Sequence, residues 1–245
     1  MTLDEAPTFP PLLQGMAAPA AQDPFEAARA QAALGCDAGL IVHAIREGTL
    51  HAAIVFAPEM PLRQATTAFV ICGIGFQNAL GALAPPEVGV HLQWDGGLRV
   101  NGAACGRLRL SASTRDPDAE PDWIVVGLDV PLRPKAGTNP GDDPNHTWLS
   151  EEGCVDVPPT TLLEAWARHT LLWVNRWLDE GARPVHTEWR ALAHGIGAPI
   201  DIALEGTRHH GTFMGVDEDF GLLLRDGDTT RVLPLSLLVD QENDT

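Results

Sequence analysis

Apolar runs of two lengths alternate along the first part of the chain and predict its strands and helices. A stretch from Phe25 to Leu34, followed by Gly35, predicts a helix. Two short apolar runs, Gly39–Ala44 and Ala52–Ala57, predict adjacent antiparallel strands because only a few residues separate them. The stretch Leu62–Leu83 again has helical character. These runs together predict a sheet flanked by helices.

A hairpin gives the clearest local signal. Val88–Trp94 and Gly106–Ser113 are apolar runs, and the dipeptide Asn101-Gly102 lies between them. Asn-Gly favours a type I′ turn because both residues accept a positive φ. The next run, Trp123–Val130, is almost continuously apolar, which is typical of a strand that is buried on both faces.

A second long helix is predicted from Thr161 to Gly181. Thr161 and Glu164 have the spacing of a capping box, in which each side chain bonds the other residue's backbone amide. Apolar residues then recur at helical spacing on one face, and we expect this face to pack in the core rather than to bind a cofactor. The residues of this face are Leu163, Trp166, Ala167, Thr170, Val174, Trp177 and Leu178.

The chain changes character near Gly195-Ile-Gly197. Beyond this point short apolar runs alternate with tight-turn signals, and we expect these strands to close on themselves as a small barrel. The runs are Ile200–Leu204, His209–Val216, Gly221–Arg225 and Arg231–Leu235.

These patterns predict an α+β fold in three parts. Residues 1–23 are rich in proline and alanine, so we expect an extended N-terminal arm. Residues 24–195 should form a mixed or antiparallel sheet packed on helices. Residues 196–245 should form the small all-β C-terminal domain.

The strongly acidic composition narrows the choice of partners. The formal net charge is -17 and the pI is about 4.7. Such a surface repels phosphate backbones and anionic lipids, so we expect neither nucleic acid nor a membrane as a partner. No apolar run approaches the roughly 20 residues that span a bilayer. The acidic N-terminus also lacks the apolar region of a signal peptide, so we expect a cytoplasmic protein.

Cysteine and histidine spacing gives no sign of a metal site. None of the four cysteines lies at metal-ligand spacing from a histidine. The adjacent His209 and His210 would point to opposite faces of a strand, so they cannot chelate an ion together. We therefore expect neither a metal nor a cofactor, and free thiols at Cys36, Cys72, Cys105 and Cys154.

The predicted hairpin resembles the signature hairpin of the biotin and lipoate protein ligases. In that family a Lys-Trp-Pro-Asn-Asp segment leads to a polar-Gly turn, a lysine and a closing Ala-Gly-Ile-Leu. Here Trp94, Leu98, Asn101-Gly102 and Cys105–Leu108 match in residue type and nearly in spacing.

Three further segments resemble the same family in the same order along the chain. Val125–Val130 resembles a family strand, and Leu149–Gly153 with the helix after it resembles the last part of the catalytic domain. Gly211–Leu224 resembles the core of the family's SH3-like module. The resemblance implies a ligase-like domain followed by an SH3-like barrel. It also implies a ligand site at Gln93, Trp94, Gly106, Arg107, Leu108, Gly127 and Asp129.

The residues that carry the family reaction are replaced in this chain. The family joins biotin to ATP and passes the acyl group to a lysine, and it uses a Gly-Arg-rich loop between its second and third strands. The connection between Ala44 and Ala57 is too short to hold such a loop. Ala103-Ala104 stands at the position of the catalytic lysine, Gln93 replaces the lysine before the tryptophan, and Asp23–Phe25 replaces the Ser-Thr-Asn that contacts biotin. Each missing donor removes about 3 kcal/mol of transition-state stabilisation, so we predict that no biotinyl-adenylate forms.

Three functions remain open on these residues. The first is a non-catalytic descendant that binds a small carboxylic acid such as biotin or lipoate, or no ligand, and acts through a protein partner. The second is a remodelled enzyme that transfers an acyl group from another donor. The third is a structural or oligomeric module, for example a homodimer, whose old cleft is filled by Val42, Ala44, Ile54 and Phe56.

Arginines near the predicted cleft bear on this choice. Four of them could hold a ligand carboxylate, although pairing with the abundant acidic residues is the simpler interpretation. They are Arg46, Arg99, Arg107 and Arg109.

Overall fold

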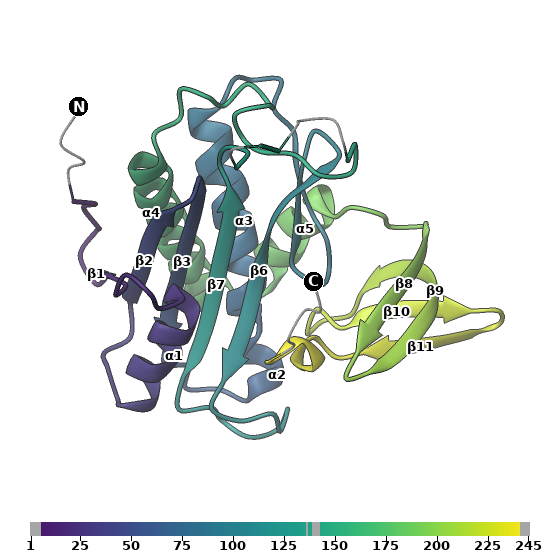
Figure 1. Cartoon of the computed structure of the whole chain (residues 1–245). Helices are drawn as coiled ribbons and strands as arrows, with labels where there is room; N and C mark the ends of the chain where they lie inside the picture. The colour runs from purple at the N-terminus through teal and green to yellow at the C-terminus, as the bar shows by residue number, and fades with distance from the viewer. Residues whose placement is uncertain (1–5, 136, 139–142, 241–245) are drawn as a thin grey trace.

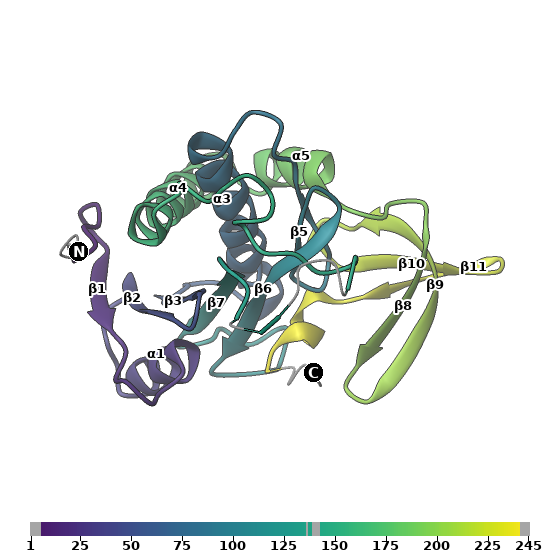
Figure 2. The same cartoon turned by 45° about the horizontal axis from the view of Figure 1, so that its top comes forward.

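A seven-stranded sheet with helices on both faces forms the larger part of the molecule. The computed structural model describes residues 6–135, 137–138 and 143–240. The strand order is β1-β2-β3-β7-β6-β5-β4. The helices α3 and α4 cover one face and α1 covers the other, while a second, four-stranded sheet lies beside the β6 side of the domain (Figures 1 and 2). This arrangement is the predicted α+β architecture.

The predicted elements of the larger part occur in the predicted order, and β1, β5 and α5 are present in addition. The strands are β1 (Gln14–Ala17), β2 (Leu40–Arg46), β3 (Thr49–Phe56), β4 (Val90–Leu92), β5 (Gly97–Val100), β6 (Ala103–Ala112) and β7 (Ile124–Pro131). The helices are α1 (Pro24–Ala33), α2 (Leu62–Ala65), α3 (Thr67–Leu83), α4 (Pro159–Glu180) and α5 (Arg183–Leu192).

The N-terminal arm contributes an edge strand that the sequence did not predict. Strand β1 pairs in parallel with β2, whereas every other neighbouring pair in the sheet is antiparallel. This one pair makes the sheet mixed. Its four residues are too few to show an alternating pattern, so only the pairing partner identifies the strand.

The helices α2 and α3 form the centre of the core. The stretch Leu62–Leu83 is long and apolar enough to cross a membrane by length and composition, which corrects the expectation that no such run exists. However, 72% of its most apolar window is buried within the fold. Trp166 of α4 donates its indole N–H to the Cys72 carbonyl at 3.0 Å, which joins α3 to α4 where the two helices lie side by side over the sheet (Figure 2).

The predicted capping box of α4 is wrong. The helix begins at Pro159, and Glu164 instead accepts hydrogen bonds from the backbone N–H and the hydroxyl of Thr8, at 2.7 and 3.0 Å. Proline at the first helical position has a helical φ and no N–H that requires a cap, so the helix starts before Thr161. The apolar face is buried from Leu162 to Trp173, whereas Leu178 is 63% exposed.

The predicted hairpin contains one strand more than expected. Asn101 and Gly102 have φ values of 48° and 93°, as the predicted turn requires, but this turn joins β5 to β6. A second turn through Gln93–Gly96 joins β4 to β5. The strand β5 was missed because Gly97–Val100 is only four residues long.

The C-terminal part is an antiparallel sheet in the order β11-β10-β9-β8. The prediction of short paired strands is confirmed, whereas hydrogen bonds do not close this sheet into a barrel within residues 143–240. The strands are β8 (Pro199–Leu204), β9 (Thr207–Val216), β10 (Leu222–Asp226) and β11 (Thr229–Leu233), and a 3-10 turn follows at Leu235–Leu238.

Candidate functional site

Strand register places three polar side chains in one row on the α1 face of the sheet. His51 of β3 pairs with Asp129 of β7, and Asp129 pairs with Arg107 of β6. Side chains two residues apart on a strand share a face. Arg109, two residues beyond Arg107, therefore lies on the same face, in the row of Gly127.

These side chains line a polar cleft of about 400 Å³. The volume lies within the range of about 300–1,000 Å³ that is usual for small-molecule sites. The cleft is bounded by Asp23, Pro24, Arg46, His51, Arg107, Arg109 and Asp129.

Arg109 is fixed on all sides. Its two terminal nitrogens bond the two carboxylate oxygens of Asp23 at 2.7 and 2.8 Å, and its Nε lies 3.1 Å from Asp129 Oδ2. The guanidinium also lies 4.4 Å from the ring centroid of Phe25. Gly127 makes room for this ring, because a Cβ there would lie 2.7 Å from it. Arg109 is therefore part of the wall of the cleft.

The pKa shifts of this pair agree with the geometry. Burial acts to raise the pKa of Asp23, but the hydrogen bonds from Arg109 and from the Phe25 amide outweigh burial and hold the pKa below its ordinary value. Burial likewise acts to lower the pKa of Arg109, and the hydrogen bond with Asp23 and the charge of Asp129 raise it overall. The pair stays ionised at neutral pH.

Arg46 ties the N-terminal arm to the sheet. Its guanidinium donates to the carbonyls of Ala18, Pro19 and Gln22 at 2.9, 2.6 and 2.9 Å. The chain before α1 thus closes one side of the cleft. Asp23 then caps α1 by accepting a hydrogen bond from the Phe25 amide at 2.9 Å.

A tight turn joins β2 to β3 at the mouth of the cleft. Glu47 and Gly48 have φ values of 49° and 76°, which closes the hairpin in two residues. The Gly48 carbonyl accepts from the amides of Leu132 and Arg133, and Lys135, the only lysine of the chain, pairs with Glu47 at 2.8 Å. This turn is therefore held against the chain after β7.

Two polar groups of the cleft remain available to a ligand. Arg107 lies 3.8 Å from Asp129 Oδ2, beyond hydrogen-bonding distance, and its side chain is 39% exposed. His51 bonds Asp129 through Nδ1 at 2.6 Å, and its Nε2 has no hydrogen bond among the described residues. Apart from His51, three guanidinium groups face two carboxylates, so cationic side chains outnumber anionic ones in this lining although the protein is acidic.

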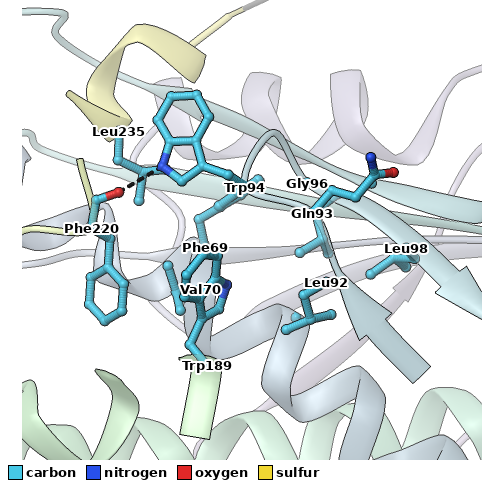
Figure 3. Close-up of a pocket in the computed structure, with 13 residues that line it drawn as sticks. Phe69, Val70, Leu92, Gln93, Trp94, Gly96, Leu98, Trp189, Phe220 and Leu235 are labelled. Carbon is cyan, nitrogen blue, oxygen red and sulfur yellow. Dashed lines mark hydrogen bonds between the residues drawn. The ribbon is translucent and has the colours of Figure 1, made fainter. Parts of the chain in front are cut away.

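A second pocket lies on the other side of the sheet and is closed. Trp94 is 3% exposed and donates its indole N–H to the Phe220 carbonyl at 2.7 Å (Figure 3). Phe69 and Trp189 pack beside it (Figure 3). The remaining space is about 10 Å³, which is about one water molecule. This pocket is the apolar junction between the main domain and the C-terminal sheet.

Five of the seven residues of the predicted site line one of the two pockets, and the two glycines line neither. Arg107 and Asp129 line the polar cleft, and Gly127 lies beneath Phe25. Gly106, with φ 108°, lets β6 approach β7, because a Cβ would collide with the Asp129 carbonyl. The other three residues, Gln93, Trp94 and Leu108, line the closed junction.

Sequence reasoning missed His51 and misplaced one arginine. It placed Asp23 in the segment that replaces the family's biotin-contact residues, but it did not identify Asp23 as the partner of Arg109. Alternation along β3 puts His51 on the face of Ala53 and Val55, which gave a signal for an isolated polar residue over the sheet. Arg99 does not line the cleft and instead donates to the Gly102 carbonyl at 2.6 Å.

Comparison with known families covers both parts of the chain. The model of the biotin/lipoate A/B protein ligase family matches residues 9–191. A model described as a domain of unknown function matches residues 205–241. A biotin--[acetyl-CoA-carboxylase] ligase of Paracoccus denitrificans is 26% identical over 189 residues, covering 76% of this chain and 78% of the relative.

Solved structures share the architecture over nearly the whole chain. A biotin protein ligase-like protein of unknown function from Silicibacter sp. TM1040 is 55% identical, with a TM-score of 0.88, and the match covers 96% of this chain and 100% of that chain. The biotin protein ligase of Aquifex aeolicus, solved in complex with biotin and ATP, is 14% identical with a TM-score of 0.67. That match covers 91% of this chain and 94% of the other and shows a shared fold.

Proposed function

Because the chain belongs to the biotin/lipoate A/B protein ligase family, we propose that it binds a small carboxylic acid of the biotin or lipoate class and does not adenylate it. The acid occupies the polar cleft, and its carboxylate pairs with Arg107. The ligand class is suggested by the biotin protein ligase of Aquifex aeolicus, which was solved with biotin and ATP.

The short β2–β3 turn is the main observation that supports the proposed loss of adenylation. Polyphosphate needs several fixed donors, because charge develops on its oxygens during the reaction. Here Glu47-Gly48 replaces a loop, and Lys135 pairs with the Glu47 carboxylate. Arg46 and Arg109 are engaged with backbone carbonyls and with Asp23. The cleft therefore lacks a group of cations that could surround a triphosphate.

Acid binding is supported by the remaining positive charge. Arg107 is the guanidinium of the cleft lining that has no hydrogen bond among the described residues. A bidentate Arg–carboxylate contact fits a single carboxylate better than a triphosphate. Beside the cleft, the buried Phe25 ring packs over Gly127 and under the Arg109 guanidinium, so the wall next to Arg107 is rigid.

Calorimetric titration of the purified full chain tests the proposal. We expect biotin, lipoate or octanoate to bind without ATP, and ATP to give no heat of binding. Arg107→Gln should weaken acid binding about 10-fold or more, because the charged hydrogen-bond donor is lost. Arg231→Gln is the matched control, since Arg231 is exposed on β11 of the other sheet and should leave the affinity unchanged.

An ATP-dependent ligation assay tests the proposed loss of adenylation. Incubation with biotin, ATP and a biotin-acceptor domain should give no labelled acceptor. Labelling above the level of a reaction without enzyme would refute the proposed loss of adenylation, and equal acid affinity of wild type and Arg107→Gln would refute the binding site.

A further inference from the structure

The hydrogen bond between His51 and Asp129 fixes which ring nitrogen carries a proton. A carboxylate can only accept, so the 2.6 Å contact to Asp129 Oδ1 requires a proton on His51 Nδ1. The lone pair of the neutral ring is then on Nε2. Among the described residues Nε2 has no hydrogen-bond donor, and His51 lines the cleft. The imidazole is thus oriented as a base.

Asp129 is itself held in place. Its Oδ2 lies 3.1 Å from Arg109 Nε and 3.8 Å from Arg107 Nε, while Oδ1 bonds His51. The Asp129 side chain is 16% exposed and the His51 side chain 32%, so the carboxylate is shielded and the base stays accessible. A shielded carboxylate that orients an accessible imidazole is the arrangement used for general-base catalysis.

Arg107 completes the constellation. It lies in the same row of the sheet, on the strand next to Asp129, and its guanidinium has no hydrogen bond among the described residues. A cation that faces the same cleft as the base can stabilise the negative oxygen that forms when a nucleophile attacks a carbonyl. Base, orienting carboxylate and cation therefore face one cleft of about 400 Å³.

We propose that this cleft hydrolyses an ester or thioester of a small carboxylic acid, with His51 as the general base and Asp129 as its positioning residue. Water attacks the acyl carbon, and His51 Nε2 takes one of its protons. The carbonyl oxygen becomes negative beside Arg107. The bond from carbon to the alcohol oxygen or thiol sulfur then breaks, the leaving group takes the proton from His51, and the free acid remains.

This inference rests on the proposed acid-binding function, because the product acid would occupy the same cleft. It also explains why one unpaired guanidinium and one oriented imidazole face the same cleft. A site for acid alone would gain nothing from a base whose lone pair faces the ligand. A hydrolytic site needs both groups.

Hydrolysis of p-nitrophenyl esters of biotin, lipoate and octanoate by the full chain tests the inference. We also include the octanoyl thioester of N-acetylcysteamine. The wild-type protein should release the leaving group above the buffer rate. His51→Ala should lower kcat/KM about 100-fold or more, as expected on loss of a general base. Added imidazole should restore part of the rate to His51→Ala, which a purely structural role of His51 would not allow.

Two further variants separate chemistry from folding. Asp129→Asn should also lower kcat, and His210→Ala should leave it unchanged, since His210 is 71% exposed on the other sheet. His51→Gln keeps a donor for Asp129, so its thermal unfolding and its acid affinity should match the wild type while hydrolysis is lost.

The outcomes distinguish the inference from the proposed function. Wild-type protein that binds the acid but hydrolyses none of the probes would overturn the hydrolytic inference and leave the proposed function intact. Hydrolysis at the wild-type rate by His51→Ala and His51→Gln would also overturn it. Failure of the wild type to bind any of the acids would instead count against the proposed function.

Discussion

The closed Trp94 junction and the open Arg107 cleft lie on the same stretch of chain but have opposite character. Trp94 is 3% exposed against the C-terminal sheet, whereas Arg107 is 39% exposed on the other face of the main sheet. The space around Trp94 is about 10 Å³ and the cleft is about 400 Å³. The hairpin thus contributes to a packed structural junction on one face of the sheet and to a polar cleft on the other face.

The difference follows from the polar and charged groups that each face of the sheet has to pair. At the junction, apolar side chains fill the space, and the buried indole N–H of Trp94 is satisfied by the Phe220 carbonyl. On the cleft face, two carboxylates hold Arg109 and His51, and Arg107 is left over. We expect changes at the junction to alter stability and changes in the cleft to alter binding.

Truncation of Trp94 should have the largest effect on the free energy of unfolding. Trp94→Ala should lower the free energy of unfolding by about 4 kcal/mol, because it removes a buried aromatic side chain. Trp94→Phe keeps most of the packing but loses the bond to Phe220, and should cost about 1 kcal/mol. Urea unfolding measures both. A loss of acid affinity in folded Trp94→Phe would contradict the separation of the two regions.

Gly106 lies between the two regions, and its substitution should have the second-largest effect on the free energy of unfolding. Gly106→Ala places a Cβ against the Asp129 carbonyl at a φ of 108°, so we expect a loss of about 3 kcal/mol in unfolding free energy. Gly102→Ala is the matched control: φ is 93°, but nothing lies within 4 Å of the added Cβ. It should cost only about 1–2 kcal/mol. Equal costs would show that the approach of β6 to β7 is not tight.

Substitution of Arg109, in the wall of the cleft, should lower the free energy of unfolding by a smaller amount. Arg109→Met removes the partner of Asp23 and leaves its carboxylate unpaired, with a cost of about 2 kcal/mol because the pair is only partly buried. The double variant with Asp23→Asn should recover part of this loss. Unfolding of the two single variants and the double variant gives the coupling, and strict additivity would show that the pair contributes nothing.

The smallest effect should be a dependence of stability on pH. The pKa of Asp23 is below its ordinary value in the folded protein, so its charge stabilises the fold above about pH 4 and this contribution is lost as pH falls further. Asp23→Asn keeps an acceptor for the Phe25 amide but has no charge. The stability difference from wild type should be full at pH 7 and disappear in acid. A constant difference would rule out the Asp23 charge as its cause.

Most of the fold could be predicted from local patterns. The apolar runs of β2, β3 and β7 predicted their strands, and Asn101-Gly102 predicted its turn, because these signals depend on neighbouring residues. Strand β1 was missed because its identity comes from pairing with β2. The start of α4 was wrong because Pro159 took precedence over the Thr161 cap.

Less of the candidate site could be predicted. Alternation along a strand is enough to put Arg107 and Arg109 on one face, and the register of β6 agrees with this placement. It could not show that Arg109 is neutralised by Asp23, which lies 86 residues away in the sequence. It also could not show that Trp94 is buried against Phe220, 126 residues away.

The sequence by itself determined most of the strands and helices, the family resemblance and the absence of a Gly-Arg-rich loop between β2 and β3, since each depends on residues close together in the chain. The tertiary structure decided which groups meet. Sheet register brought His51, Asp129 and Arg107 into one row, although they come from three strands. Charge pairing and burial depend on distance in space, and that distance is fixed only when β3, β7 and β6 pair.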